Sequence, residues 1–145
     1  PDDIERINSK HLKTLDFKTI KKTFNLNFSC EFWEIIRSNI DSIDEAIEWH
    51  DLIEKKFHLK KKIVLRKNLK GIIIDSLPDS IDKNAWLDWT SKILERFEIK
   101  PKDLYICLRE ILTGKKFGPS MNDLLTLIKK DEIIKRLEFN CEEKD

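Results

Sequence analysis

The stretch LREILTGKKFGPSMNDLLTLI, residues 108–128, predicts a helix, a sharp turn and a second helix. Its apolar residues follow helical spacing up to Gly114, a residue type that suits the left-handed position just after a helix. Ser120 and Asn122 are residue types that begin helices, and they predict a short helix after the turn. The turn itself holds two lysines, a second glycine, a proline and a phenylalanine. A plain connector needs only a glycine and a few polar residues.

Helical spacing of apolar residues continues along most of the chain on both sides of this stretch. We expect further helices at these places: one capped by Asp2 or Asp3 that carries Ile4, Ile7, Leu12 and Leu15; Asp16–Phe24; one capped by Ser29 with Phe32, Trp33, Ile36 and Ile40; one begun by the capping-box spacing Ser42-Ile43-Asp44-Glu45; Asp82–Glu98; one from Pro101 with Leu104, Cys107, Leu108, Ile111 and Leu112 on its inner face; and Asp131–Phe139. The segment Ile63–Leu77 has β-branched runs that fit a strand and a buried short helix equally well. The prediction is an all-α bundle of about seven to nine short helices.

The composition bounds the class of protein. The chain has 145 residues, 40% hydrophobic and 38% charged, which is enough for the core of one domain or slightly more. Its net charge is only +1, so the overall charge indicates no partner. No apolar run approaches the ~18 residues of a membrane span. The start at Pro1 without Met indicates a fragment of something longer.

Residues that carry catalytic or metal chemistry are few and scattered. The three cysteines, at 30, 107 and 141, form neither a zinc pattern nor a disulfide framework, so we expect reduced thiols in a cytosolic protein. His11, His50 and His58 have no partner at catalytic spacing, and the chain has no glycine-rich phosphate loop. Core positions rather than base-stacking ones are expected for the tryptophans Trp33, Trp49, Trp86 and Trp89. The sequence therefore predicts no active site.

Two basic features are candidates for binding. Residues 55–70 carry eight Lys and Arg and no acid, with Phe57 and His58 interleaved. Such a block can release counterions from a phosphate backbone, although a solvated face of a lysine-rich protein looks the same. The other feature is the turn, where Arg109 on the outward side of its helix, Lys115 and Lys116 could hold an anion or an unpaired base. A plain helix–helix turn fits this second feature equally well.

The segment LREILTGKKFGPSMNDLLTLIKKDEIIKRL, residues 108–137, resembles the C-terminal end of bacterial glutamyl-tRNA synthetases. That end typically reads Leu-Arg, a Thr-Gly turn, a variable tip with Gly-Pro, an apolar helix and a final Arg-Leu. DIERINSK, residues 3–10, resembles the segment that leads into the anticodon-binding part of these enzymes. FWEIIRSNIDSIDEAIEW, residues 32–49, is similar to the early helices of that part, especially in α-proteobacterial members. The resemblance is collinear over nearly the whole chain and is poor over residues 55–80.

The resemblance implies an α-helical cage that grips a tRNA anticodon loop, with connecting helices over residues 1–28 and the anticodon-binding domain over residues 29–145. It implies that Arg109 and the loop at Gly118, Pro119 and Met121 contact the anticodon, and we expect Arg109 to face solvent on a groove rim near Lys115 and Lys116. The implied partner is glutamate tRNA. ATP and Mg belong to a catalytic part whose class I signature sequences are absent here, so this chain is expected to use no cofactor and to charge no tRNA alone. We further expect a cytoplasmic monomer that binds neither DNA nor membranes.

Two positions depart from the family pattern. Many members have an arginine two residues after the position of Arg37, and it reads the last anticodon base; this chain has Asn39 there. A guanidinium only donates, so it favours the C of glutamate tRNA and repels the G of glutamine tRNA, whereas an amide suits both. We therefore expect tolerance of glutamine tRNA, unless Arg37 swings inward. The family also usually has Gly at the position of Lys129, where Lys would cost on the order of 1 kcal/mol more if φ were positive.

Two other functions stay open at this point. A helical protein-interaction module, with residues 55–70 as a solvated face, is the main alternative. A DNA-binding helix-turn-helix fits less well, because no helix concentrates Arg, Asn and Gln on one edge.

Overall fold

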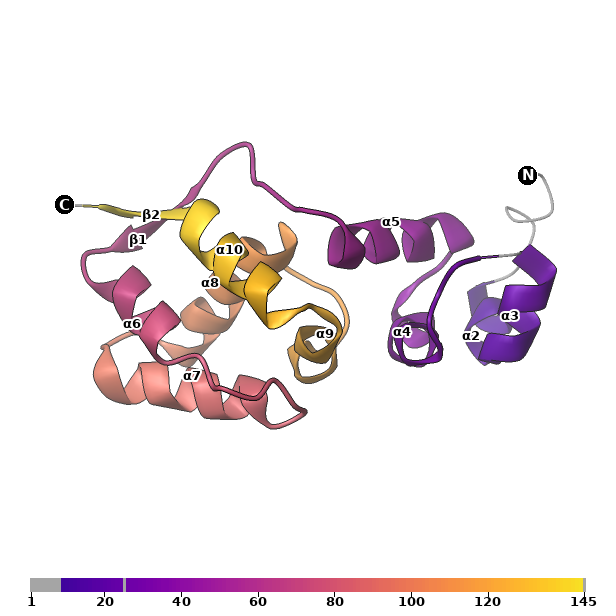
Figure 1. The fold of residues 1–145 in the computed structure, drawn as a ribbon, viewed down its shortest axis with the longest axis horizontal. Helices are drawn as coiled ribbons and strands as arrows, with labels where there is room; N and C mark the ends of the chain where they lie inside the picture. The colour runs from indigo at the N-terminus through magenta and orange to yellow at the C-terminus, as the bar shows by residue number, and fades with distance from the viewer. Residues whose placement is uncertain (1–8, 25, 145) are drawn as a thin grey trace. The chain divides into compact units, whose positions relative to one another are not determined.

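The computed structural model describes residues 9–24 and 26–144, with side chains from Leu12 onward (Figure 1). Within these residues it holds nine α-helices, one 3-10 turn and two short strands, so the all-α prediction is confirmed. The chain divides into two compact units, Pro1–Lys55 and Lys56–Asp145. The domain division predicted at residues 28 and 29 stays a prediction.

The first unit is a set of short helices around buried aromatic and branched side chains. Its elements are α2 (Ser9–Thr14), α3 (Phe17–Phe24), α4 (Cys30–Ile36), η1 (Arg37–Asn39) and α5 (Ile43–Glu54). The predicted cap at Ser29 is confirmed, since its Oγ accepts a hydrogen bond from the Phe32 amide at 3.1 Å. Trp33 is fully buried, and its indole Nε1 donates to the carbonyl of Leu15 at 2.7 Å. The start of the first predicted helix, with Ile4 and Ile7, lies outside the described residues.

The capping box predicted at Ser42 forms with one change. The Ser42 Oγ accepts from the Glu45 amide at 3.2 Å, as that motif requires. The return bond to the Glu45 carboxylate comes from the amide of Asp41 at 3.3 Å instead of from Ser42. Both bonds satisfy amides at the start of α5 that have no partner within the helix.

The second unit packs its helices around the apolar face of α8. Its elements are β1 (Ile63–Arg66), α6 (Leu69–Asp75), α7 (Ala85–Arg96), α8 (Pro101–Thr113), α9 (Met121–Leu127), α10 (Lys130–Phe139) and β2 (Cys141–Lys144). α10 packs on α8, α6 and β2, while α7 packs on α6, α8 and α9 (Figure 1). The predicted inner face of α8 is confirmed at Leu104, Leu108, Ile111 and Leu112, all fully buried, but Cys107 is only half-buried.

The helix predicted over Asp82–Glu98 is shorter in the structure. α7 begins at Ala85, because a turn precedes it in which the Asn84 amide donates to the Asp82 side chain at 2.9 Å. Trp89 is buried, as predicted, and its Nε1 donates to the Ile73 carbonyl at 2.8 Å. The core prediction also holds for Trp33 and Trp49, whereas Trp86 is only half-buried and reaches the surface.

Both alternatives for residues 63–77 occur, one after the other. β1 occupies Ile63–Arg66, and α6 follows after Asn68, which takes the left-handed conformation at φ 76°. β1 pairs in parallel with β2 in the register Ile63↔Cys141 to Arg66↔Lys144 (Figure 1). No strand was predicted at residues 141–144. CEEK lacks the β-branched and aromatic residues typical of strands, so its pairing depends on the distant partner.

Lys129 carries no backbone strain. It precedes α10 with φ −61° and ψ 141°, which is extended backbone that any residue adopts. The cost of about 1 kcal/mol considered for a positive φ therefore does not arise at this junction. Among the described residues, no helix is long and apolar enough to cross a membrane.

The three cysteines, all within the described part of the chain, should differ sharply in reactivity. Cys30 is exposed, whereas Cys141 is buried with its Sγ donating to the Leu137 carbonyl at 2.9 Å. Burial raises the pKa of the Cys107 thiol to about 12, and Cys141 and Glu110 add repulsion. Because the thiolate is the reactive form, a disulfide reagent such as DTNB should label Cys30 rapidly at about pH 8 and the other two only after unfolding. Two fast-reacting thiols in the folded chain would contradict this.

Candidate nucleic-acid interface

The turn that follows α8 begins at Gly114, which is closely packed against Phe57. Gly114 ends α8 at φ 72°, the left-handed conformation predicted for it, and its amide donates to the Glu110 carbonyl at 2.8 Å. A Cβ at this position would lie 2.7 Å from the Cζ of Phe57, so only glycine fits without displacement. The Thr113 hydroxyl donates to the Arg109 carbonyl at 2.7 Å and accepts from the Lys115 amide at 3.1 Å. These contacts fix the direction in which the turn leaves the helix.

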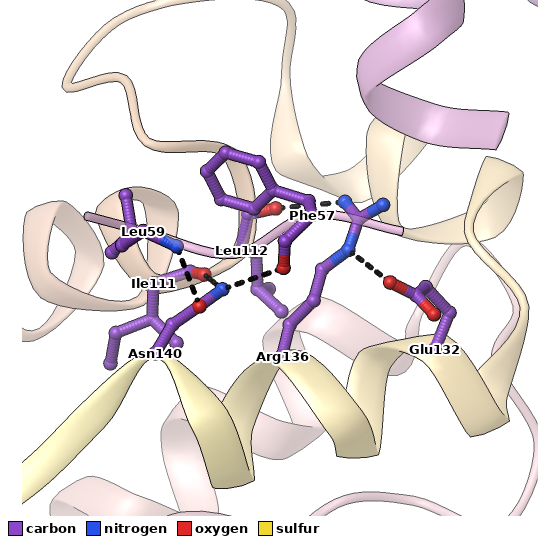
Figure 2. A network of polar contacts seen from close by, with 7 residues as sticks. All are labelled: Phe57, Leu59, Ile111, Leu112, Glu132, Arg136 and Asn140. Atoms are coloured by element: carbon purple, nitrogen blue, oxygen red, sulfur yellow. Dashed lines mark hydrogen bonds and ion pairs between the residues drawn. The ribbon is translucent and has the colours of Figure 1, made fainter. Parts of the chain in front are cut away.

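Two side chains cap the C-terminal end of α8: Arg136 from α10, and Asn140 from the C-terminal end of α10 (Figure 2). The Arg136 Nη1 donates to the Leu112 carbonyl at 2.9 Å, and the Asn140 Nδ2 donates to the Ile111 carbonyl at 2.9 Å. Carbonyls in the last turn of a helix have no partner inside it, so these bonds satisfy groups that would otherwise be buried unpaired. The Asn140 Oδ1 also accepts from the Leu59 amide at 2.9 Å, which holds residues 57–59 beside the turn.

The Arg109 side chain, which belongs to α8, reaches across the base of the turn to Pro119. Its Nη1 donates to the Pro119 carbonyl at 2.9 Å, and its side chain is half-buried. Burial lowers the pKa of the Arg109 guanidinium, the direction expected when a cation loses water. Arg109 was expected to face solvent on a groove rim; its side chain is only half exposed, because its guanidinium reaches back to the turn it supports. One N–H is used there, and the guanidinium carries others that remain available to a ligand.

Arg109 does line a small hollow, as predicted for a groove rim. The cavity measures about 250 Å³ and is lined by Trp86, Tyr105, Ile106, Arg109, Ser120 and Met121. The rings of Trp86 and Tyr105 lie 6.1 Å apart, and both are partly exposed. Sequence reasoning missed these two aromatics. Tyr105 could have been found from its i, i+4 spacing to Arg109, but Trp86 reaches the hollow only because α7 packs on α8.

The tip of the turn is exposed. Lys115, Lys116 and Gly118 are exposed, and Phe117, at 82%, is the most exposed large apolar side chain among the described residues. Pro119 and Met121, predicted to contact the anticodon, are buried; Met121 lines the hollow beside Arg109. The turn therefore presents two ammonium groups and one aromatic ring on a rigid base.

The other two predicted site residues lie in the first unit, at η1. Arg37 is half-buried: its Nη1 donates to the Leu15 carbonyl at 3.1 Å, and its Nη2 lies 3.3 Å from a Glu34 carboxylate oxygen. Asn39 is exposed, and its Nδ2 donates to the Ser38 hydroxyl at 3.3 Å. If the Arg37 side chain turned toward a bound anticodon base, it would break its contacts with Leu15 and Glu34. The Asn39 amide is exposed to solvent, so a ligand could reach it in its present position.

The basic stretch at residues 55–70 divides into two roles. Arg66 and Lys70 are structural: Arg66 stacks on the Phe97 ring at 4.7 Å, and the Lys70 Nζ donates to the Glu138 carbonyl at 2.7 Å and to the Cys141 carbonyl at 3.0 Å. Exposed side chains belong to Lys55, which pairs with Asp51 at 3.3 Å, and to Lys56, Lys60, Lys61, Lys62 and Lys67. His50 is half-buried and His58 is exposed. In the described part of the chain, no group of three His, Cys, Asp or Glu side chains is placed to hold a metal ion.

Residues 30–141 match the family model described as "Anticodon binding domain", so the chain belongs to this family. Its curated relatives include a glutamate–tRNA ligase 1 of Wolbachia sp. subsp. Brugia malayi (strain TRS), 36% identical over 139 residues, or 93% of this chain and 31% of that protein. Ligases of the same name are 34% identical in Rickettsia bellii (strain OSU 85-389), over 94% of this chain and 32% of that protein, and in Rickettsia prowazekii (strain Madrid E), over 93% and 31%. This chain thus spans about a third of these relatives. The predicted resemblance to the anticodon-binding part of α-proteobacterial glutamyl-tRNA synthetases is confirmed.

Proposed function

We propose that this chain recognises the anticodon loop of a tRNA as part of a glutamate–tRNA ligase. The observation that carries the proposal is the turn at residues 114–118, which projects two lysines and the ring of Phe117 from a base that Arg109, Arg136 and Asn140 hold in place. Membership of the anticodon-binding family supports it. An exposed aromatic ring leaves apolar surface in water, and stacking on an RNA base would remove part of that surface from water.

The chemistry of the turn suits an unpaired RNA loop. Unstacked bases can stack on exposed aromatic rings, and arginine can donate two hydrogen bonds to a base edge or a phosphate. Lysines near the backbone add affinity that does not depend on sequence. Because the base of the turn is already rigid, binding RNA here costs less conformational entropy than binding RNA at a flexible loop would.

A filter-binding titration with tRNA, its isolated anticodon stem-loop and duplex DNA tests the proposal. We expect the stem-loop to bind nearly as tightly as whole tRNA, and duplex DNA to bind far more weakly. Equal binding of all three would indicate a nonspecific basic surface. Binding of none would favour the alternative, a helical protein-interaction module.

We further propose particular partners and a location for the chain. The RNA is glutamate tRNA, and glutamine tRNA is also accepted. The chain acts as a monomer in the cytoplasm, without DNA or membrane contacts. ATP and Mg²⁺ act in the catalytic part of the ligase.

Replacing Arg109 with alanine should weaken tRNA binding by about 1–3 kcal/mol, the scale of a good bidentate base contact. In the ligase this should raise the KM for tRNA and leave the KM for ATP unchanged. Arg96→Ala is the matched control, because Arg96 is a more exposed arginine of the same unit that pairs with Asp75 on α6. If Arg109→Ala and Arg96→Ala have equal effects on tRNA binding, Arg109 does not contact the RNA.

Neutralising two exposed lysines of the basic stretch should reduce the salt dependence of tRNA binding. With Lys60→Ala and Lys61→Ala together, the slope of log K against log salt concentration should flatten by about one to two units, because fewer counterions are released. The paired control is Lys83→Ala with Lys92→Ala, both exposed and near α7. An unchanged slope would identify the stretch as a solvated face.

A further inference from the structure

A second hollow lies beside the turn, on α10 and the segment that precedes β1. Its volume is about 260 Å³, and it is lined by Lys56, Phe57, His58, Glu132, Lys135 and Phe139. All of these residues belong to the second unit. Apart from the general phosphate attraction proposed for residues 55–70, none of the roles described above uses this hollow.

The hollow has an aromatic wall that is open to solvent. Phe139, the last residue of α10, is 51% exposed, and its ring centroid lies 5.8 Å from that of His58 at an angle of 63°. His58 is exposed as well. The two rings meet edge to face, so each keeps an exposed face of its own on which a nucleobase can stack.

The charges around the hollow favour an anion. Lys56 and Lys135 are both exposed at its edge. Glu132 is the one acid among the described residues that line it, and its Oε1 accepts from the Arg136 Nε at 3.0 Å (Figure 2). Arg136 therefore offsets the Glu132 charge, and the two ammonium groups leave the site positive. Two lysines beside a stacking surface match a phosphate attached to a base.

The size of the hollow restricts the ligand. Pockets for drug-sized molecules measure roughly 300–1,000 Å³. The hollow, at about 260 Å³, lies just below that range, so it suits one ring system with one phosphate better than a larger ligand.

Phe57 joins this hollow to the base of the turn. Its ring lines the hollow, contacts Gly114 and lies under the Arg136 guanidinium at 5.4 Å. The Asn140 side chain bonds the backbone of residues 57 and 59, as Figure 2 shows. The wall of the hollow is therefore held by the same buried network that caps α8. An RNA strand at the turn would pass close to the hollow.

We propose that this hollow binds one nucleotide of the tRNA outside the three anticodon bases. Its base stacks on the Phe139 ring with the His58 ring beside it, and its phosphate lies between Lys56 and Lys135. This inference rests on the proposed function, because it requires the chain to bind tRNA through the turn.

Photo-crosslinking tests the contact directly. The photoreactive residue p-benzoylphenylalanine is placed at position 139 in one variant and at position 117 in another, and each is irradiated with the anticodon stem-loop. We expect crosslinks from both, with position 139 mapping to a nucleotide outside the anticodon. Crosslinking from position 117 alone overturns this inference and leaves the proposed function intact. Crosslinking from neither position counts against the proposed function itself.

Binding measurements provide the second test. Phe139→Ala should weaken stem-loop binding about tenfold, within the range measured for loss of one base stack. Phe139→Trp should restore the affinity, and Phe139→Leu should not, which separates stacking from apolar packing. Leu87→Ala, at a side chain 61% exposed on α7, should change the affinity by less than about twofold. If Phe139→Leu binds as tightly as the unchanged chain, stacking at this hollow is excluded.

The two lysines are tested by salt dependence. Lys56→Ala with Lys135→Ala should flatten the salt slope by about one to two units, whereas Lys83→Ala with Lys92→Ala should leave it unchanged. Equal slopes for both pairs would exclude a phosphate at the hollow.

Discussion

Replacing Arg136 with alanine should lower the free energy of unfolding of the second unit by about 3–5 kcal/mol, the usual cost of removing one partner of a buried ion pair. Arg136 is fully buried, bonds the Leu112 carbonyl at 2.9 Å and the Glu132 carboxylate at 3.0 Å, and lies over the Phe57 ring (Figure 2). Its loss leaves a buried carbonyl without its donor and a poorly hydrated carboxylate without its cation. It also leaves a cavity under Phe57.

Hydrogen exchange of amides in α8 and α10 gives the appropriate measurement, because the chain has two units and global unfolding need not be a single transition. The matched control is Arg96→Ala. Its ion pair with Asp75 is also short, at 2.8 Å, but both side chains are substantially exposed. Exposed pairs contribute about 0–1 kcal/mol, and the hydrogen bond from the Arg96 Nη1 to the Ser76 hydroxyl, at 2.9 Å, adds about 1 kcal/mol, so the control should lose no more than about 2 kcal/mol. Similar losses for the two variants would show that burial of Arg136 is not the cause.

Replacing Asn39 with arginine should shift the preference of the proposed ligase toward glutamate tRNA and away from glutamine tRNA. Arginine at this position would gain a contact to C, worth about 1–3 kcal/mol, and would place donors against the donors of G at a similar cost. The two effects add in the ratio of kcat/KM for glutamate tRNA over glutamine tRNA. That ratio should therefore rise by a factor on the order of a hundred or more. Asn39 is exposed, so the substitution should not affect folding.

The test measures kcat/KM for both tRNAs with the unchanged enzyme and with the Asn39→Arg variant. It decides whether Asn39 permits the use of glutamine tRNA. Asn39→Gln is the control, because it lengthens the side chain and keeps the amide donors and acceptor. The control should leave both tRNAs acceptable. If the unchanged enzyme already prefers glutamate tRNA by several hundred-fold, Asn39 is not permissive. Arg37 would then be the candidate for discrimination, at the cost of its bonds to Leu15 and Glu34.

Much of the helical structure could be read from local sequence. The caps at Ser29 and Ser42, the proline at the start of α8 and the left-handed Gly114 all occupy their predicted positions. Each depends on side chains or backbone angles within one turn of the chain, so local chemistry is sufficient.

Where the structure differs from the sequence-based predictions, the cause is a contact between residues that are distant in the sequence or lie on different elements. β2 was missed because its strand conformation comes from pairing with β1, far earlier in the chain, in the register that joins Ile63 to Cys141. Arg109 was expected to point outward from the periodicity of α8, but the Pro119 carbonyl draws its guanidinium across the turn. Trp86 has the spacing of a core residue, yet it is only half-buried and lines the hollow beside Arg109.

By itself, the amino-acid sequence determined the helical class, the inner face of α8, the turn that follows it and the family to which the chain belongs. Only the tertiary structure decided how that turn is supported. Arg136 and Asn140 cap α8 through backbone carbonyls, and every residue has such a carbonyl, so no sequence pattern marks the partners in advance. The same holds for Phe57, whose contact with Gly114 brings the basic segment beside the turn. A buried polar group must find a partner wherever the fold provides one, and that choice depends on packing rather than on local order along the chain.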